Sequence, residues 1–173
     1  TEPVADSVLG YVLCFARNLL DLSRSMKAGI WHKIPGRSLR ECTLGIVGVG
    51  NVGKAAARRA RAFGMTLLGH DPVDMPSEFL AATGIRMVTL TELLAHSDFI
   101  SLNCDLNPTS RHLIGSREFS QMKHSAVVIN TARGPIIDEG ALISALENVV
   151  IAGAALDVYE KEPLPADSPL RKM

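Results

Sequence analysis

Three closely spaced glycines, Gly48, Gly50 and Gly53, form the part of the sequence best suited to binding phosphate groups. The first glycine allows a tight turn, the second lets a phosphate approach the backbone, and the third lets a helix pack closely on a strand. A helix opening near Asn51 would direct its free N–H groups at this turn, where they could bind two phosphates. Glycines with this spacing also occur in ordinary turns, so the turn by itself is weak support for a dinucleotide site.

An acidic residue, Asp71, follows this turn at the distance expected for a carboxylate that binds a ribose. Between them the sequence predicts a helix over 54–62 and a strand over 65–69, and an apolar strand over 44–47 precedes the turn. The aspartate could accept hydrogen bonds from both hydroxyls of an adenosine ribose, whereas it would repel the 2′-phosphate of NADP. The pattern therefore predicts NAD as the cofactor. The alternative is an ordinary turn acid before a proline.

Three later loops carry further side chains that could do chemistry, and each loop follows a predicted strand. The first contains Cys104 and Asp105, the second Arg133, and the third Asp157 and Glu162. Because parallel strands end at one sheet edge, we expect these loops to converge on a crevice that could hold a nicotinamide. There a guanidinium could bind a carboxylate and polarise its neighbouring carbonyl, while a carboxylate could orient a histidine acting as general acid and base. The arginine could instead cap a helix, and Glu162 could be a solvated loop acid.

Predicted strands and helices alternate along the chain, which favours an α/β fold: a doubly wound, parallel Rossmann sheet with strand order 3-2-1-4-5-6. The length of 173 residues suits one such cofactor-binding domain with an additional helix at its N-terminal edge. Thr89 or Thr91, and Asp138, are expected to cap helices. The further strands are predicted over residues 86–88, 98–102, 126–130 and 151–156, and further helices over 116–122 and 138–147.

The N-terminal segment, residues 4–28, has apolar residues at helical spacing, which predicts one helix that Gly29 ends. The apolar stripe consists of Val8, Val12, Phe15, Leu19 and Leu22. Much of the remaining circumference is apolar as well. We therefore expect residues 1–30 to pack against a second domain or a second subunit, giving a homodimer through this helix. A plain core helix is the alternative.

The composition argues against two kinds of partner. Lysine plus arginine and aspartate plus glutamate both number 18, so no net charge would attract nucleic acid or an anionic membrane. The basic run Lys54, Arg58, Arg59 and Arg61 fits a solvated helix face. The longest apolar run, residues 8–16, is too short to cross a bilayer, and no signal peptide is visible.

The three cysteines, Cys14, Cys42 and Cys104, are an odd number without the spacing of a metal site. No metal is therefore expected, and the cysteines favour the reducing cytoplasm. The sequence begins at Thr1 rather than at a methionine, directly before a helix. We therefore expect it to be a piece of a longer protein.

Four stretches of the sequence, GIVGVGNVG, HDP, INTARGPIIDEGALISAL and GAALDVYEKEPLP, are the most specific. Together they resemble the D-isomer-specific 2-hydroxyacid dehydrogenases, which include phosphoglycerate, glycerate and glyoxylate/hydroxypyruvate enzymes. The resemblance implies an NAD cofactor, a small 2-hydroxy or 2-keto acid substrate, and hydride transfer between C4 of the nicotinamide and C2 of the acid. It also implies that Arg133 binds substrate and is catalytic, and that Glu162 is the partner of the catalytic histidine.

The resemblance further implies which residues lie along the cofactor. The turn of Gly48, Gly50 and Gly53 would face the pyrophosphate together with Asn51 and Val52, Asp71 would bind the ribose, and Cys104, Thr131, Ala132, Arg133 and Asp157 would surround the nicotinamide half.

Two features depart from the family. Where the family often has His-x-Pro, this chain has Asn103-Cys104-Asp105. The family's catalytic histidine would fall beyond Met173, and its substrate domain is absent, so we expect an NAD-binding domain that is inactive by itself. One alternative is an NAD-sensing, non-catalytic regulator similar to a corepressor. Another is an NAD enzyme similar to alanine dehydrogenase, which the Thr-Ala-Arg-Gly loop argues against.

Overall fold

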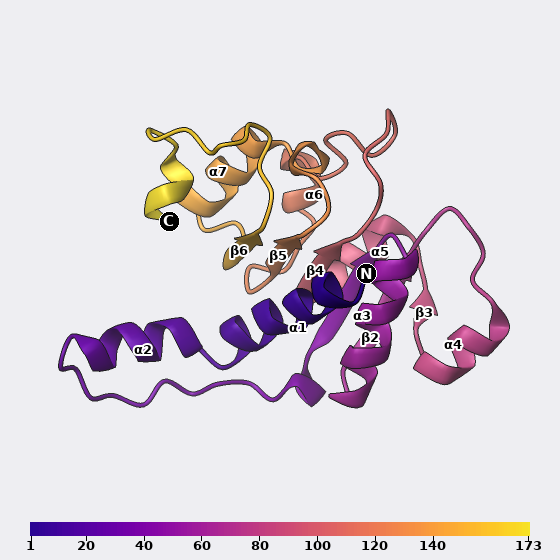
Figure 1. Ribbon diagram of the computed structural model, residues 1–173, viewed down its shortest axis with the longest axis horizontal. Helices are drawn as coiled ribbons and strands as arrows, with labels where there is room; N and C mark the ends of the chain where they lie inside the picture. The colour runs from indigo at the N-terminus through magenta and orange to yellow at the C-terminus, as the bar shows by residue number, and fades with distance from the viewer.

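The computed structural model describes residues 1–173, and its framework is one sheet of six parallel strands (Figure 1). The strand order is β3-β2-β1-β4-β5-β6, which confirms the predicted doubly wound Rossmann sheet. The strands are β1 Thr43–Val47, β2 Thr66–His70, β3 Arg86–Met87, β4 Phe99–Leu102, β5 Val127–Asn130 and β6 Gly153–Leu156. Every strand end lies within two residues of its predicted position.

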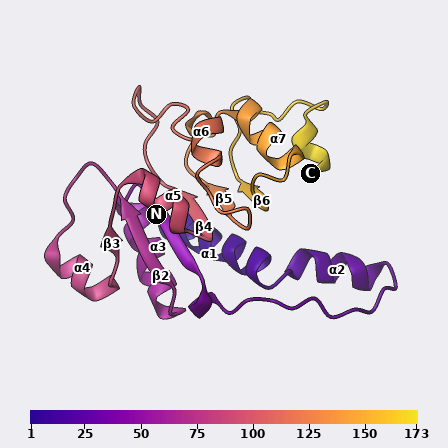
Figure 2. The same cartoon turned by 180° about the vertical axis from the view of Figure 1, so that it is seen from behind.

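Helices cover both faces of the sheet (Figures 1 and 2). They are α1 Glu2–Ala16, α2 Leu19–Lys27, α3 Asn51–Ala62, α4 Ser77–Thr83, α5 Leu90–His96, α6 Ser116–Phe119 and α7 Glu139–Glu147. Helices α1 and α3 share one apolar cluster with Leu44 and Ile46 of β1, whereas α5 and α7 share another with Val47 and Ile100. Burial on both faces explains the continuous apolar runs of these strands. The sequence did not predict α4, and α6 is shorter than predicted.

The helix ends differ in how they are capped. Thr89 Oγ1 accepts a hydrogen bond from Glu92 N at 3.2 Å, and Asp138 Oδ1 accepts one from Ala141 N at 3.0 Å, which confirms both as caps. Helix α3, which follows the glycine turn, begins at Asn51, and no side chain caps it at the N-cap position, Gly50. The first N–H groups of α3 are therefore left without a side-chain acceptor.

The pairing register aligns the carboxyl ends of the strands. Val47 of β1 lies opposite His70 of β2 and Leu102 of β4. Leu102 lies opposite Asn130 of β5, which in turn lies opposite Leu156 of β6. The loops that follow these strands therefore leave the sheet at one edge, as predicted.

The N-terminal segment is not the single helix that its apolar stripe predicts. It breaks at Asn18, which adopts a left-handed conformation with φ of 53° between α1 and α2. Asparagine tolerates this conformation better than most residues. Val8 and Val12 are fully buried in the domain's own core, so this part of the stripe forms a plain core helix. The prediction that these two residues face another domain or subunit is wrong.

Helix α2 and residues 28–38 form an arm that stands out from the sheet (Figures 1 and 2). The irregular segment after α2 runs back along the helix toward the sheet. No residue of α2 is buried. Two hydrogen bonds close the base of the arm: Asn18 Nδ2 donates to Pro35 O at 3.1 Å, and Arg37 N donates to Ala16 O at 2.8 Å. The arm thus leaves apolar side chains in water without making a core of its own.

Asp98 joins several elements at the opposite, amino-terminal edge of the sheet. Its Oδ2 accepts a hydrogen bond from Thr43 N at 2.8 Å, and its Oδ1 lies 3.2 Å from Lys123 Nζ and 3.3 Å from an Arg37 nitrogen. Burial would raise the pKa of this carboxyl group, but the Thr43 N–H and the two cations together hold its pKa below the ordinary value. The ionised carboxylate therefore stabilises the fold.

We expect Asp98→Ala to lower the free energy of unfolding by about 1–3 kcal/mol near neutral pH, because the Thr43 N–H loses its acceptor. A carboxylate with a lowered folded pKa stabilises above its unfolded pKa and loses that contribution as pH falls through the folded value. The deficit of the variant should therefore shrink in acid. Urea denaturation at about pH 7 and about pH 3 measures both values. The exposed Asp167→Ala serves as control, and an equal deficit at both pH values would contradict the assignment.

Candidate functional site

Two glycines of the turn are required by the packing of the chain itself. A Cβ atom on Gly48, whose φ is +88°, would lie 2.5 Å from the backbone nitrogen of Cys104. A Cβ atom on Gly53 would overlap the carbonyl oxygen of Gly48. These glycines therefore hold the loop after β4 and the start of α3 directly against the end of β1.

The third glycine, Gly50, is not required by any neighbour. A Cβ atom there would meet nothing within 4 Å. This free space lies at the uncapped start of α3, where backbone N–H groups and the helix dipole favour an anion. The turn thus leaves room at its centre for the pyrophosphate of a dinucleotide.

Asp71 is fastened to the same turn. Its Oδ2 accepts a hydrogen bond from Val49 N at 2.7 Å, and its Oδ1 accepts one from Val73 N at 2.9 Å. The side chain is half-exposed, immediately after β2. Its carboxylate therefore has a fixed place beside the glycine turn and still has lone pairs for a ligand.

A cavity of about 380 Å³ lies between the loops that follow β4 and β5. It brings together five of the predicted cofactor residues, Val52, Cys104, Thr131, Ala132 and Arg133, with Val4, Asn103, Asp105 and Leu106 completing its walls. The hydroxyl oxygen of Thr131 is buried and has no hydrogen-bond partner. A buried polar atom without a partner in a cavity wall fits a ligand that carries polar groups.

Asn130, which the sequence analysis placed only at the end of a strand, shapes this cavity. It is 1% exposed, its Oδ1 accepts from Ala132 N at 3.1 Å, and its Nδ2 donates to Arg133 O at 2.9 Å. The amide thereby fixes the turn of the loop after β5. In the sequence, the only indication of this role is that Asn130 is a polar residue at the end of an otherwise apolar strand.

The Arg133 side chain is exposed and forms no ion pair with an acidic residue of the chain. Its Nη1 donates to the neighbouring Ala132 O at 2.7 Å. The remaining N–H groups are free to bind an incoming carboxylate. Arg133 does occupy the N-cap position of the short 3-10 helix Gly134–Ile136, and its carbonyl oxygen accepts a hydrogen bond from Ile136 N at 3.2 Å. Its side chain makes no capping hydrogen bond, so the guanidinium is not used to cap this helix.

Cys104 forms part of the cavity wall. Burial raises the pKa of its thiol, and the negative charges of Asp105 and Asp71 raise that pKa further. The neutral thiol is a small apolar group, suited to contact with a planar ring.

The loop after β6 carries Asp157 and Glu162, neither of which lines this cavity. The backbone N–H of Asp157 donates a hydrogen bond to Asn130 O at 3.0 Å. The side chain of Asp157 lies near Tyr11 of α1, whose pKa is raised by the burial of the tyrosine and by the negative charge of Asp157. Glu162 is exposed, and its Oε1 accepts from Tyr159 N at 3.0 Å. A Cβ atom on Gly134 would overlap the carbonyl of Tyr159, so this loop lies directly on the turn that carries Arg133.

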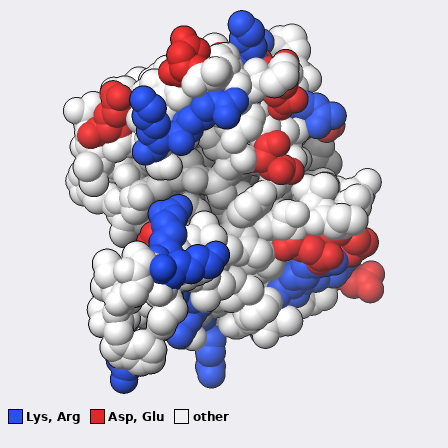
Figure 3. Space-filling model, turned by 60° about the vertical axis from the view of Figure 1, so that its left-hand side comes forward, with Lys and Arg blue, Asp and Glu red and all other residues white.

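Charged side chains do not form an extended patch of one sign on the face drawn in Figure 3, where basic and acidic groups lie in small clusters among uncharged surface. The basic Arg59 pairs with Glu2 and Asp6, both at 2.6 Å.

No group of three or more histidine, cysteine, aspartate or glutamate side chains could hold a metal ion. None of the helices has the length and apolar character needed to span a bilayer.

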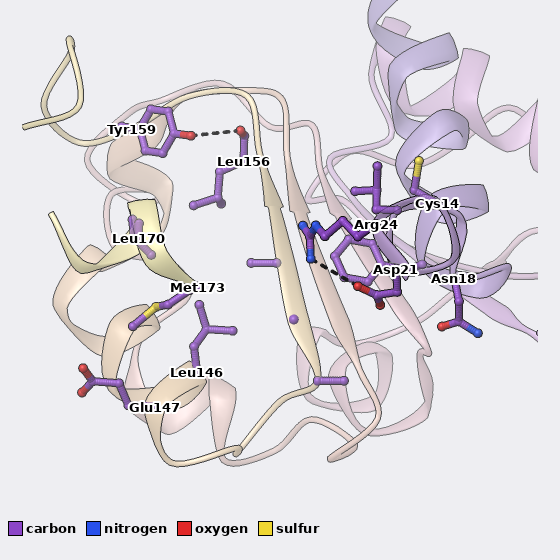
Figure 4. A pocket seen from close by; sticks show the side chains of 15 residues that line it. Cys14, Asn18, Asp21, Arg24, Leu146, Glu147, Leu156, Tyr159, Leu170 and Met173 are labelled. Atoms are coloured by element: carbon purple, nitrogen blue, oxygen red, sulfur yellow. Dashed lines mark hydrogen bonds and ion pairs between the residues drawn. The ribbon is translucent and has the colours of Figure 1, made fainter. Parts of the chain in front are cut away.

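A larger cavity, of about 600 Å³, lies elsewhere, between the arm and the C-terminal part of the chain. Figure 4 shows Cys14, Asn18 and Arg24 on one side of it and Leu146 and Met173 on the other. It contains none of the predicted site residues. Most of its lining is hydrophobic, and two of its charged residues, Asp21 and Arg24, pair with each other at 3.2 Å.

Comparison with known proteins gives the family of the chain. The model of the D-isomer specific 2-hydroxyacid dehydrogenase, NAD binding domain, matches residues 9–173. A D-3-phosphoglycerate dehydrogenase of Methanocaldococcus jannaschii is 42% identical, over 96% of this chain and 32% of its own length. A glyoxylate reductase of Korarchaeum cryptofilum is 40% identical, over 100% of this chain and 54% of its own.

The likeness extends to solved structures. The crystal structure of a D-isomer specific 2-hydroxyacid dehydrogenase from Xanthobacter autotrophicus Py2, in complex with NADPH and MES, is 35% identical. It superposes with a TM-score of 0.90 over 98% of this chain and 70% of that one. The present chain spans about half of the length of the glyoxylate reductase and about a third of that of the phosphoglycerate dehydrogenase. It belongs to the NAD-binding domain family of the D-isomer specific 2-hydroxyacid dehydrogenases.

Proposed function

We propose that this chain binds NAD along the carboxyl edge of its sheet. The pyrophosphate would lie at Gly50, against the N–H groups of Asn51 and Val52, and Asp71 would bind the adenosine ribose. The nicotinamide would enter the cavity walled by Cys104, Thr131 and Ala132, with Asp157 nearby. The observation that carries this proposal is the free space at Gly50, in front of an uncapped helix and beside a carboxylate held 2.7 Å from Val49 N.

We further propose that the whole protein oxidises or reduces a small 2-hydroxy or 2-keto acid. NAD would supply the hydride acceptor, and NADH the donor, at C4 of the nicotinamide. Arg133 would hold the substrate carboxylate with its planar guanidinium and polarise the carbonyl at C2. Glu162, which has one oxygen uncommitted, would orient a histidine outside this chain and stabilise its protonated form.

The rest of the organisation follows from the same proposal. Residues 1–173 would form the NAD-binding domain, and residues 1–30 would connect it to a substrate domain and to a second subunit in a homodimer. The three cysteines are free thiols, which fits a cytoplasmic protein. The relatives described above are named as dehydrogenases or reductases, and no observation favours a non-catalytic regulator.

We place the dimer contact on the arm rather than on the buried stripe of α1. Leu20 and Met26 of α2 are 57% and 53% exposed, and Trp31 beyond it is 78% exposed. Apolar side chains gathered on a protruding segment favour contact with another chain. Such a contact would give α2 the apolar partner that it lacks within the domain.

The cofactor proposal predicts that the chain binds NADH more tightly than NADPH, because Asp71 would face the added phosphate. One relative was solved in complex with NADPH, so membership of the family does not by itself decide between the two cofactors. An acidic residue at the ribose favours NAD, because it repels a 2′-phosphate. Calorimetric titration of both cofactors measures it. Asp71→Ala should weaken NADH binding and narrow the difference, whereas Asp74→Ala, an exposed acid of the same loop, should change neither. Equal affinities for the two cofactors in the wild-type chain would contradict the ribose assignment.

For the full-length enzyme, we expect Arg133→Lys to lower kcat/KM by about 10²–10³, because lysine keeps the charge but loses the bidentate geometry. Both kcat and KM for the keto acid should suffer, while NADH affinity should change little. Arg111→Lys, on an exposed loop, is the matched control. Unchanged kinetics in Arg133→Lys would show that the substrate lies elsewhere, and a wild-type protein without turnover would favour the regulator.

The dimer proposal predicts that Leu20→Asp combined with Trp31→Asp converts the full-length protein to a monomer. Both side chains are exposed, so the circular dichroism spectrum and the melting temperature should stay near the wild-type values. Light scattering reads the mass. A dimeric mass that persists in this variant would rule out the arm as the interface, and a monomeric wild-type protein would rule out the dimer.

A further inference from the structure

A histidine–carboxylate pair outside the cavity links two of the loops at the carboxyl edge. His112 Nε2, in the loop after β4, lies 2.6 Å from Glu160 Oε1, in the loop after β6. Neither residue lines the cavity beside Arg133. The pair is therefore not part of the nicotinamide pocket, yet it stands between the loops that form the edge of the site.

Glu160 is also bound to the start of α7. Its Oε1 accepts a hydrogen bond from Glu139 N at 3.4 Å, and its own backbone N–H donates to Glu139 Oε2 at 3.2 Å. The other side-chain hydrogen bonds of residues 159–162 stay within this loop or reach Leu156 of β6. Glu160 therefore makes all the side-chain hydrogen bonds that join residues 159–162 to the loop after β4, through His112, and to the start of α7, through Glu139.

His112 is anchored independently to the turn that carries Arg133. Its backbone N–H donates to Pro135 O at 2.8 Å, two residues beyond the arginine. The histidine adopts a left-handed conformation with φ of 51°, uncommon for a residue other than glycine. This one residue thus holds the Arg133 turn with its backbone and the Glu162 loop with its ring.

We propose that His112, acting through Glu160, is a positioning residue that sets the separation of Arg133 and Glu162. The inference rests on the proposed function, in which these two residues act on one substrate. The two loops already touch, because the Tyr159 carbonyl lies against Gly134. The His112–Glu160 pair supplies the directional bond that fixes how they touch, and Glu162 lies only two residues beyond that bond.

The pair suits a positioning role better than a structural one. Both side chains are partly exposed, at 41% for His112 and 33% for Glu160. A pair this accessible adds little to global stability, so variants should fold. The acidic groups facing the imidazole are Glu160 and, behind it, Glu139.

The test uses the full-length enzyme with three variants. His112→Ala removes the ring, His112→Gln keeps an N–H donor that does not titrate, and His124→Ala removes an exposed histidine without a hydrogen bond. We expect His112→Ala to lower kcat for keto-acid reduction by up to about 100-fold, with unchanged NADH affinity and melting temperature. His112→Gln should recover most of this loss, and His124→Ala should match the wild type.

The pH profile separates positioning from a structural effect. Reduction needs a protonated histidine, whose pKa a well-placed Glu162 raises, so the rate is present at low pH and lost as pH rises through that pKa. His112→Ala should move this loss to lower pH, in the same direction as Glu162→Gln. The pH profile of His112→Gln should stay near that of the wild type. Because glutamine does not titrate, this result would show that the loss of rate at high pH does not come from titration of His112 itself.

Amide hydrogen exchange of residues 159–162 provides a readout that does not depend on turnover. We expect faster exchange in His112→Ala than in the wild type or His112→Gln. An active wild-type enzyme with unchanged kcat, pH limb and exchange in His112→Ala would overturn the inference and leave the proposed function intact. A wild-type protein that turns over no 2-keto acid would overturn the proposed function, and unchanged loop exchange would still count against the pair on its own.

Discussion

The register of the parallel sheet is the constraint on which the site depends. Because β1, β2, β4, β5 and β6 end at one level, the five loops that follow them leave the sheet side by side. Backbone contacts then bring these loops close: Gly48 meets the loop after β4, and Gly134 meets the loop after β6. Both contacts exclude a Cβ atom, so the compactness of this edge depends on glycine at two positions.

The two edges of the sheet use charge in opposite ways. At the amino-terminal edge, the carboxylate of Asp98 is surrounded by Lys123, Arg37 and the Thr43 N–H. Its charge is therefore compensated within the domain and stabilises the contacts between these segments. At the carboxyl edge, Arg133 forms no ion pair, and Asp71 accepts only backbone hydrogen bonds. The charges of Arg133 and Asp71, which have no partner of opposite sign, and the compensated charge of Asp98 at the other edge fit an α/β domain that binds ligands beyond its strand ends.

Much of the fold could be predicted because it rests on local patterns. Buried strands appear as apolar runs, the glycines mark a turn between a strand and a helix, and Asp138 marks the start of a helix. The break at Asn18 could not be predicted, because it depends on a hydrogen bond to Pro35 across the arm. The apolar stripe of Val8 and Val12 could not show whether its partner was the same domain. The role of the His112–Glu160 pair arises from a contact between loops, which spacing along the chain does not encode. Asn130 acts within its own loop, but its two hydrogen bonds there depend on the conformation of that loop.

The central claim is that the cofactor lies at the glycine turn and in the smaller cavity, not in the larger apolar one beside the arm. Titration of the isotope-labelled chain with NAD, followed by backbone amide resonances, tests it directly. The account predicts the largest shifts at Gly50, Val52, Thr131 and Ala132, with the residues lining the larger cavity unaffected. Shifts confined to Leu146, Leu170 and the other residues around that larger cavity would contradict it.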